Sequence, residues 1–103
     1  MNILLVCSAG MSTSLLVTKM EKAAKEQGKE YKIWAVAEAD APKHIPNADV
    51  VLIGPQMRFW KSEAEKLAKP YGVAVDVIST VDYGMNDGPK VLRFAEKLAN
   101  NKK

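Results

Sequence analysis

A run of aliphatic residues gives way to small polar residues close to the N-terminus: Ile3-Leu4-Leu5-Val6-Cys7-Ser8-Ala9-Gly10-Met11-Ser12-Thr13-Ser14-Leu15-Leu16. The aliphatic run predicts a strand buried on both faces, and the residues from Ser12 onward are typical of a helix start. The residues between them therefore form a strand-to-helix turn, with Cys7 at its mouth. In parallel sheets, chemistry is carried out at turns of this kind.

A thiol at this turn faces the first backbone N–H groups of the following helix. Their unsatisfied donors and the positive end of the helix dipole favour an anion, so the thiolate form of Cys7 is favoured. The same N–H groups and the nearby hydroxyls are suited to hold a phosphate bonded to the sulfur. The predicted phosphate-binding residues are Ser8, Ala9, Gly10, Met11, Ser12, Thr13 and Ser14. A lone cysteine is also a common buried hydrophobe, so a structural role for Cys7 stays open beside the nucleophile.

The rest of the chain alternates between strand and helix patterns. Residues 31–37 suggest an edge strand, whereas the continuous aliphatics within 49–54 suggest a central one. Gly28 is the predicted C-terminal cap of the first helix. The last helix starts near Asp87, after a long loop that begins at Ser79. The predicted strands are 3–6, 31–37, 49–54 and 73–78, and the predicted helices are 14–27, a short turn within 41–47, 55–69 and the C-terminal helix.

This alternation predicts an α/β protein, a three-layer sandwich in which helices cover both faces of a four-stranded parallel sheet. The plausible strand order is 2-1-3-4, whose direction reverses beside the first strand. Ligands bind outside the carboxyl ends of strands at such a reversal, and Cys7 emerges there. The segments 56–59 and 82–87 follow the third and fourth strands, so we expect them to be neighbours of Cys7.

Composition excludes several classes of protein. The 103 residues suit one domain, spanning 1–103, and the net charge of +3 comes from mixed signs, which argues against a nucleic-acid partner. Neither a membrane span nor a secretion signal is visible, so we expect a cytoplasmic protein without direct membrane insertion. One cysteine and one histidine exclude an internal disulfide and a metal cluster, and no nucleotide-binding motif indicates a cofactor. His44, between two prolines, is assigned no catalytic role.

Three motifs resemble the IIB component of the bacterial sugar phosphotransferase system (PTS), lactose/cellobiose type. They are Cys7-Ser8-Ala9-Gly10-Met11-Ser12-Thr13-Ser14-Leu15-Leu16-Val17, Ala48-Asp49-Val50-Val51-Leu52-Ile53-Gly54-Pro55-Gln56 and Tyr83-Gly84-Met85-Asn86-Asp87-Gly88. The resemblance implies that Cys7 accepts a phosphoryl group from a phosphohistidine of the IIA component. Cys7 would then donate it to a sugar, a cellobiose- or lactose-like β-glycoside, held by the membrane component IIC. Tyr83 and Asp87 belong to the third motif, and whether they touch phosphate or shape the loop stays open.

The spacing also invites comparison with the low-molecular-weight protein tyrosine phosphatases, which resemble this family in fold. Those enzymes use Cys, five residues, Arg and then Ser, whereas here Thr13 occupies the Arg position and Ser14 the Ser position. Without a guanidinium to clamp phosphate oxygens, hydrolysis of aryl phosphates should be poor. Asp82 lies where such phosphatases carry a general acid. A phosphatase with Cys7 and Asp82 is therefore the alternative, and a non-catalytic interaction domain is the third hypothesis.

Overall fold

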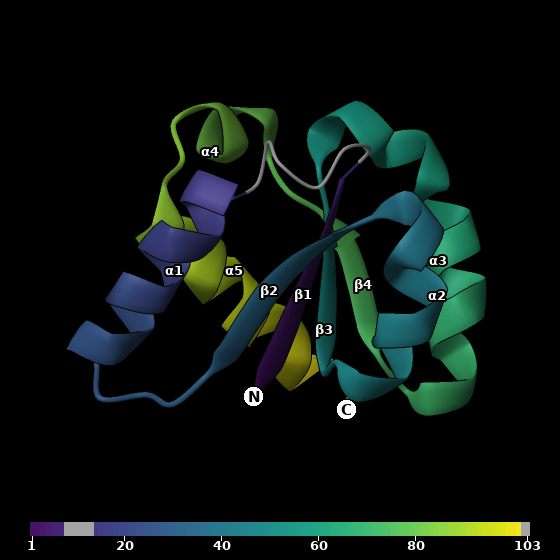
Figure 1. Ribbon diagram of the computed structural model, residues 1–103, viewed down its shortest axis with the longest axis horizontal. Coiled ribbons are helices and arrows are strands. Elements are labelled where there is room, and N and C mark those ends of the chain that lie inside the picture. Colours follow the sequence, from purple (N-terminus) through teal and green to yellow (C-terminus); the bar gives the residue numbers. More distant parts are fainter. Residues whose placement is uncertain (8–13, 102–103) are drawn as a thin grey trace.

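The structure, a computed structural model, describes residues 1–7 and 14–101. Its sheet has four parallel strands in the order β2-β1-β3-β4 (Figure 1), so the predicted order is confirmed. Ile3 pairs with Ile33 on one side and with Val50 on the other, which makes β1 a central strand. The strands are β1 (Asn2–Cys7), β2 (Lys32–Ala37), β3 (Val50–Ile53) and β4 (Ala74–Val77).

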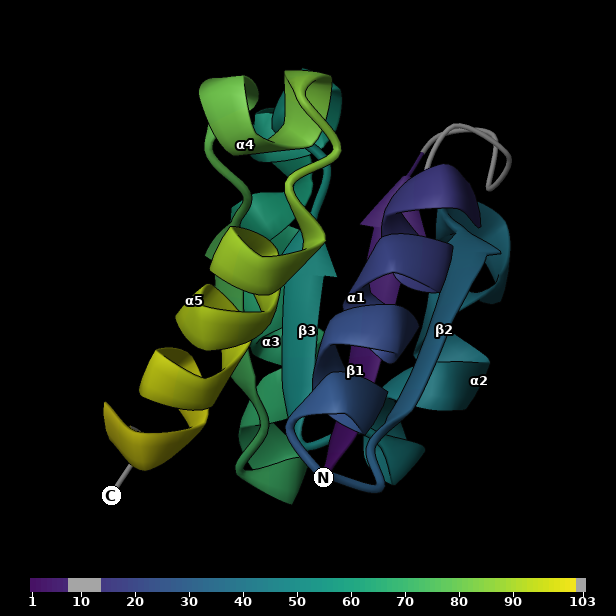
Figure 2. The ribbon, with the colours of Figure 1, turned by 90° about the vertical axis from the view of Figure 1, so that its left-hand side faces the viewer.

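Helices cover both faces of this sheet, as predicted for a three-layer sandwich. Figure 2 shows α1 (Ser14–Glu26) and α5 (Gly88–Asn101) side by side on one face, with α2 (Ala41–His44) and α3 (Lys61–Ala68) on the other. The short α4 (Thr80–Gly84) lies beyond the carboxyl end of β4. No helix among the described residues is both long enough and apolar enough to cross a membrane.

Alternation along β1 divides its side chains between two cores. Ile3 and Leu5 pack in the cluster beneath α1 and α5, whereas Leu4 and Val6 pack in the cluster beneath α2 and α3. All four side chains are fully buried. Burial of one Leu or Ile side chain contributes about 1.5–3 kcal/mol of hydrophobic stabilisation, so these four side chains are major contributors to the two cores. The aliphatic run therefore predicted both the position and the double burial of β1.

The predicted continuous helix over 55–69 was wrong. A 3₁₀ helix covers Pro55–Trp60, α3 follows, and a further 3₁₀ turn covers Lys69–Tyr71. Met57 leaves helical geometry with φ −118° and ψ 25°, and its N–H is bonded to the Gly54 carbonyl at 2.9 Å. Met57 and Trp60 are both buried, and their spacing of three matches the 3₁₀ repeat. Core packing of these side chains overrides the α-helical pattern.

Two smaller predictions have different outcomes. Gly28 ends α1 with φ +72°, and the Lys29 N–H reaches back to the Ala24 carbonyl at 2.9 Å, so the predicted cap is confirmed. The predicted loop 79–89, however, contains α4. Ser79 accepts hydrogen bonds from the N–H groups of Val81 and Asp82, an N-cap whose serine signal was present in the sequence.

Gly88 sets how closely α1 and α5 approach. A Cβ added at Gly88 would lie 2.6 Å from the carbonyl carbon and 2.7 Å from the carbonyl oxygen of Lys19 in α1. These are backbone atoms, which cannot rotate away as the end of a side chain can. Gly88 is buried at the start of α5. The glycine therefore permits a contact that any side chain would push apart.

We expect Gly88→Ala to lower the free energy of unfolding by about 1–3 kcal/mol, since over-packing forces the two helices to shift. The matched control is Gly84→Ala, because an added Cβ there meets nothing within 4 Å. That variant should stay within about 0.5 kcal/mol of the wild type. Urea denaturation of the two variants checks the prediction, and equal stabilities would contradict the packing argument.

A polar cluster ties the start of β2 to α5 at the sheet end opposite Cys7. Glu96 accepts hydrogen bonds from the Lys29 ammonium and, at 2.7 Å, from the Tyr31 hydroxyl. Burial opposes ionisation of Glu96, but these hydrogen bonds outweigh it and lower its pKa below the ordinary value of 4.5. The hydrogen bond to Glu96 raises the pKa of both Lys29 and Tyr31. The cluster is therefore most stabilising with Glu96 ionised and both partners protonated.

Because the folded-state pKa of Glu96 is lowered, its contribution is present above the ordinary glutamate pKa and is lost as pH falls through the lowered value. We expect Glu96→Gln to show a smaller drop in thermal midpoint between pH 7 and pH 3 than the wild type shows. Glu65→Gln, on the exposed side of α3, is the control and should behave as wild type. An acid-induced drop in Glu96→Gln as large as in wild type would refute the assignment.

Candidate functional site

Cys7 is the last residue of β1 and lies opposite Ala37, the last residue of β2. It stands at the carboxyl edge of the sheet, beside the reversal of strand order, which is where the sequence placed it. The side chain is fully buried and packs in the cluster beneath α2 and α3. The position agrees with either a structural or a nucleophilic cysteine, so its chemical role stays a prediction.

Most of the predicted phosphate-binding segment lies outside the described residues, namely Ser8, Ala9, Gly10, Met11, Ser12 and Thr13. Ser14 is described: it is exposed and begins α1. Its carbonyl accepts a hydrogen bond from the Thr18 hydroxyl at 3.1 Å. Figure 2 shows that α1 begins at the edge of the sheet at which β1 ends.

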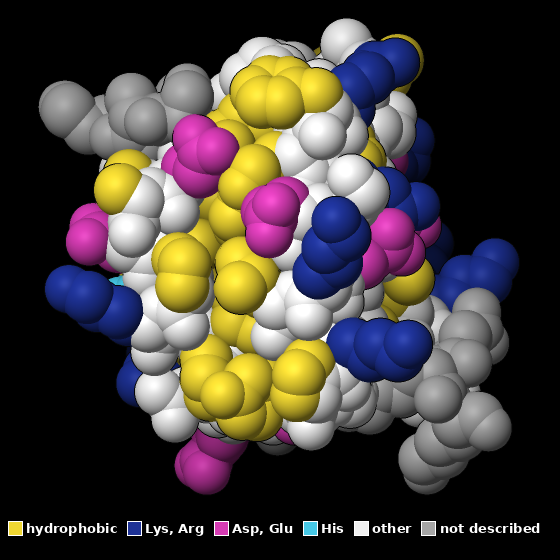
Figure 3. Space-filling view, turned by 90° about the vertical axis from the view of Figure 1, so that its right-hand side faces the viewer, with side chains coloured by type: hydrophobic (Ala, Val, Ile, Leu, Met, Phe, Trp, Pro, Cys, Tyr) yellow, Lys and Arg dark blue, Asp and Glu magenta, His cyan; other side chains and the backbone are white. Residues whose placement is uncertain are grey.

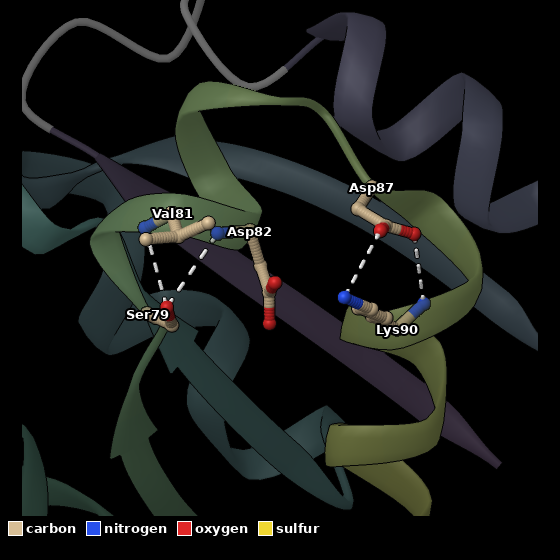
Figure 4. A network of polar contacts seen from close by, with 5 residues as sticks. All are labelled: Ser79, Val81, Asp82, Asp87 and Lys90. Carbon is tan, nitrogen blue, oxygen red and sulfur yellow. Dashed lines mark hydrogen bonds and ion pairs between the residues drawn. The ribbon is translucent and has the colours of Figure 1, made fainter.

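Asp82 lies in α4. Its backbone N–H, not its carboxylate, takes part in the N-cap that begins this helix. Its N–H donates to the Ser79 hydroxyl at 3.5 Å, next to the bond of 3.2 Å from Val81. Figure 4 shows the Asp82 carboxylate projecting between this turn and the start of α5, with no bond to either. The side chain is half-buried. The capping turn thus fixes where Asp82 lies and leaves its carboxylate available.

Asp87 caps α5. Its Oδ1 accepts the Lys90 N–H at 3.2 Å, and its Oδ2 lies 3.9 Å from the Lys90 ammonium (Figure 4). The preceding Asn86 has φ +51°, a left-handed conformation that asparagine tolerates better than most residues. Both residues therefore shape the entry into α5, and whether Asp87 also touches phosphate stays open.

Tyr83 links the segments that follow β3 and β4. Its hydroxyl accepts a hydrogen bond of 3.2 Å from Nε2 of Gln56. Segments 56–59 and 82–87, which we expect to be neighbours of Cys7, therefore contact each other at this pair. Sequence analysis gave Gln56 no role of its own, although its place directly after β3 and Gly54-Pro55 was a usable signal.

Large apolar side chains are exposed around the same edge. Phe59, beside Arg58 in the 3₁₀ helix after β3, is 73% exposed. Leu15 in the first turn of α1 is 53% exposed, and Val81 and Met85 at α4 are 65% and 69% exposed. Exposed apolar groups gathered at one edge are typical of a surface that docks other proteins.

The face that carries α2 and α3 has no uniformly charged patch in Figure 3. Figure 3 shows hydrophobic side chains gathered there along one strip, with basic and acidic side chains on either side. This mixing agrees with the interspersed charges of the sequence. Among the described residues, no group of three or more His, Cys, Asp or Glu side chains could hold a metal ion.

A parallel sheet in this order, with a cysteine at the end of its first strand, defines the class of α/β proteins that share the fold of the low-molecular-weight tyrosine phosphatases. Residues 2–94 match the family described as PTS system, lactose/cellobiose-specific IIB subunit, and the chain belongs to this family. It is thus a phosphotransferase component of a sugar uptake system, and such components pass phosphate from a IIA protein to sugar.

Similar proteins cover nearly the whole chain. The galactose-specific EIIB component of Lactococcus lactis subsp. cremoris (strain MG1363) is 52% identical, with 95% of each chain covered. The oligo-beta-mannoside-specific EIIB component of Bacillus subtilis (strain 168) is also 52% identical, with 96% of each covered. The solution structure of a cellobiose-specific phosphotransferase IIB component from Borrelia burgdorferi is 48% identical, with a TM-score of 0.82 over 100% of this chain and 94% of that one.

The capping role of Asp87 predicts different outcomes for two substitutions. Asp87→Ala should cost about 1 kcal/mol of stability through the lost cap, whereas Asp87→Asn should keep the cap and most of that stability. If capping is the whole function of Asp87, Asp87→Asn should also carry phosphate at the wild-type rate. Thermal unfolding and phosphorylation assays check both points, and a large rate loss in a stable Asp87→Asn variant would contradict the capping role.

Proposed function

We propose that Cys7 is the residue that carries the phosphoryl group in this IIB component. The observation that carries the proposal is the place of the chain's single cysteine at the carboxyl end of central strand β1, at the reversal of strand order. Reactive groups in open parallel sheets gather at this place. The proposed phosphate cradle is the backbone of residues 8–14, ending where Ser14 begins α1.

The proposed reaction has two transfers that balance. In the first, the Cys7 thiolate attacks the phosphorus of a phosphohistidine on IIA, the P–S bond forms, and the P–N bond breaks with its electron pair returning to the imidazole. In the second, a sugar hydroxyl attacks the same phosphorus and the P–S bond breaks. The electron pair returns to sulfur, and the hydroxyl proton passes to a base or to solvent. Neither transfer consumes a cofactor.

Burial of Cys7 sets a condition on this chemistry. The side chain is fully buried in this structure, whereas in-line attack requires the sulfur to meet a phosphorus atom on another protein. Transfer therefore includes a local rearrangement that uncovers the sulfur when the donor docks. Such a requirement also shields the resulting phosphocysteine from water between the two transfers, which suits a carrier.

The phosphatase alternative rests on Asp82 and on the shared fold. Its carboxylate projects beside the start of α5 and makes no bond to the other residues drawn in Figure 4. Against this, Thr13 stands where phosphatases place the arginine that stabilises the transition state. We therefore favour the carrier, with slow loss of phosphate to water.

The proposed partners are a IIA protein with a phosphohistidine and a membrane component IIC that holds the sugar. Both would dock on the rim of Leu15, Phe59, Val81 and Met85, whose exposed apolar side chains surround the carboxyl edge of the sheet. We propose a β-glycoside such as cellobiose or lactose as the final acceptor. Relatives of equal identity are named for different sugars, so their names do not single out one sugar for this chain, and we propose that the membrane partner selects it. Residues 1–103 would act as one EIIB domain in the cytoplasm.

Intact-mass spectrometry tests the carrier. The protein is incubated with phosphoenolpyruvate, the general phosphotransfer proteins and a lactose/cellobiose-type IIA. We expect one phosphate adduct on the wild type and none on Cys7→Ser, because the hydroxyl of serine is a far weaker nucleophile than a thiolate. Equal labelling of Cys7→Ser, or rapid aryl phosphate hydrolysis without an adduct across several IIA donors, would overturn the proposal.

If this apolar rim docks IIA, a substitution in it should weaken binding of IIA without slowing the transfer step. Phe59→Ala should raise the KM for phosphorylated IIA by about fivefold to tenfold, since interface aromatics often contribute more than 1 kcal/mol, and leave kcat near the wild-type value. Tyr71→Ala is the matched control, because Tyr71 is 57% exposed but lies in the turn before β4, at the other end of the sheet. An identical KM for both variants would exclude Phe59 from the interface.

A further inference from the structure

Gly54 is the backbone neighbour of Cys7 on the β3 side of the site. Ile53 pairs with Val6, and the Gly54 N–H donates to the Val6 carbonyl at 3.0 Å. Gly54 directly follows β3, and continuing the register places it across from Cys7, at the strand spacing of about 4.8 Å. Whatever lies over Gly54 is close to the end of β1.

The side chain of Gln56 lies over Gly54. Its Oε1 is 2.8 Å and its Nε2 3.3 Å from the point at which a Cβ of Gly54 would stand. The absence of a side chain at position 54 thus makes room for the carboxamide. Because side chains alternate along a strand, this point lies on the face of Leu52, which packs in the cluster beneath α1 and α5. The carboxamide is therefore on the face of the sheet at which α1 begins.

Tyr83 holds the carboxamide in this place. The Tyr83 ring packs against the cluster beneath α1 and α5, and its hydroxyl accepts one N–H of Gln56 at 3.2 Å. A carboxamide has a second N–H and a carbonyl oxygen. Within the described part of the chain, neither of these groups of Gln56 has a further hydrogen-bond partner. Gln56 thus offers a held, neutral donor beside the end of β1.

We propose that the second N–H of Gln56 donates a hydrogen bond to a phosphoryl oxygen during transfer to Cys7, with Tyr83 as a positioning residue that acts through Gln56. This inference rests on the proposed function. A neutral donor stabilises the charge that spreads over the phosphoryl oxygens during transfer. It lacks the full positive charge of a guanidinium, which would also speed the attack of water. Gln56 therefore favours a carrier over a phosphatase.

The rate of Cys7 phosphorylation by phosphorylated IIA, measured by rapid quench and intact mass, tests the inference. Gln56→Ala should lower kcat about tenfold with little change in KM, as expected for one hydrogen bond made mainly in the transition state. Gln56→Glu should lower kcat further, because a carboxylate repels the phosphoryl oxygens. Gln27→Ala, an exposed glutamine after α1 at the far end of the sheet, is the matched control and should match wild type.

The positioning role of Tyr83 predicts a double-mutant result that a merely structural role would not give. Tyr83→Phe should lower kcat severalfold, and adding it to Gln56→Ala should lower kcat no further, because its effect passes through Gln56. Additive losses would refute the role of Tyr83, and a raised KM with unchanged kcat would make Gln56 a docking residue. If wild type itself carries no phosphate on Cys7, the proposed function fails. If wild type is phosphorylated and Gln56→Ala matches Gln27→Ala, this inference alone fails.

Discussion

Parallel pairing of β1 with both neighbours is the constraint on which the rest of the structure depends. Because β2, β1, β3 and β4 all run in one direction, every strand delivers the segment that follows it to the same edge. That edge therefore receives Cys7 from β1, Gly54 and Gln56 from β3, and the capped α4 from β4. A strand buried on both faces is needed for this arrangement, and the aliphatic run Ile3–Val6 supplies it.

The features that depend on local sequence could be predicted. The aliphatic runs predicted the central strands, their alternation with helical patterns predicted the strand order, and Gly28 predicted the end of α1. Features that depend on packing at a distance could not be predicted in this way. The break at Met57 arises because Met57 and Trp60 both enter the core, and the place of Gln56 depends on Tyr83, which is far along the chain.

In the candidate site too, some features follow from local sequence and others from distant packing. The place of Cys7 and the helix start near Asp87 followed from the pattern, whereas the bond from the Lys90 N–H that makes Asp87 the cap is seen only in the structure. Residues 8–13 lie outside the described residues, so the predicted cradle still rests on sequence. What the structure adds is one connected contact of Gly54, Gln56 and Tyr83 beside the end of β1.

In the proposed mechanism, the site holds phosphate rather than releasing it to water. The proposed donors are backbone N–H groups, hydroxyls and a carboxamide, none of which carries a formal positive charge. The ³¹P resonance of phosphorylated protein, followed over time without a sugar acceptor or IIC, tests this claim most directly. The account predicts a sulfur-bound phosphorus signal that decays orders of magnitude more slowly than it forms from phosphorylated IIA. Inorganic phosphate appearing as fast as Cys7 is charged would contradict it.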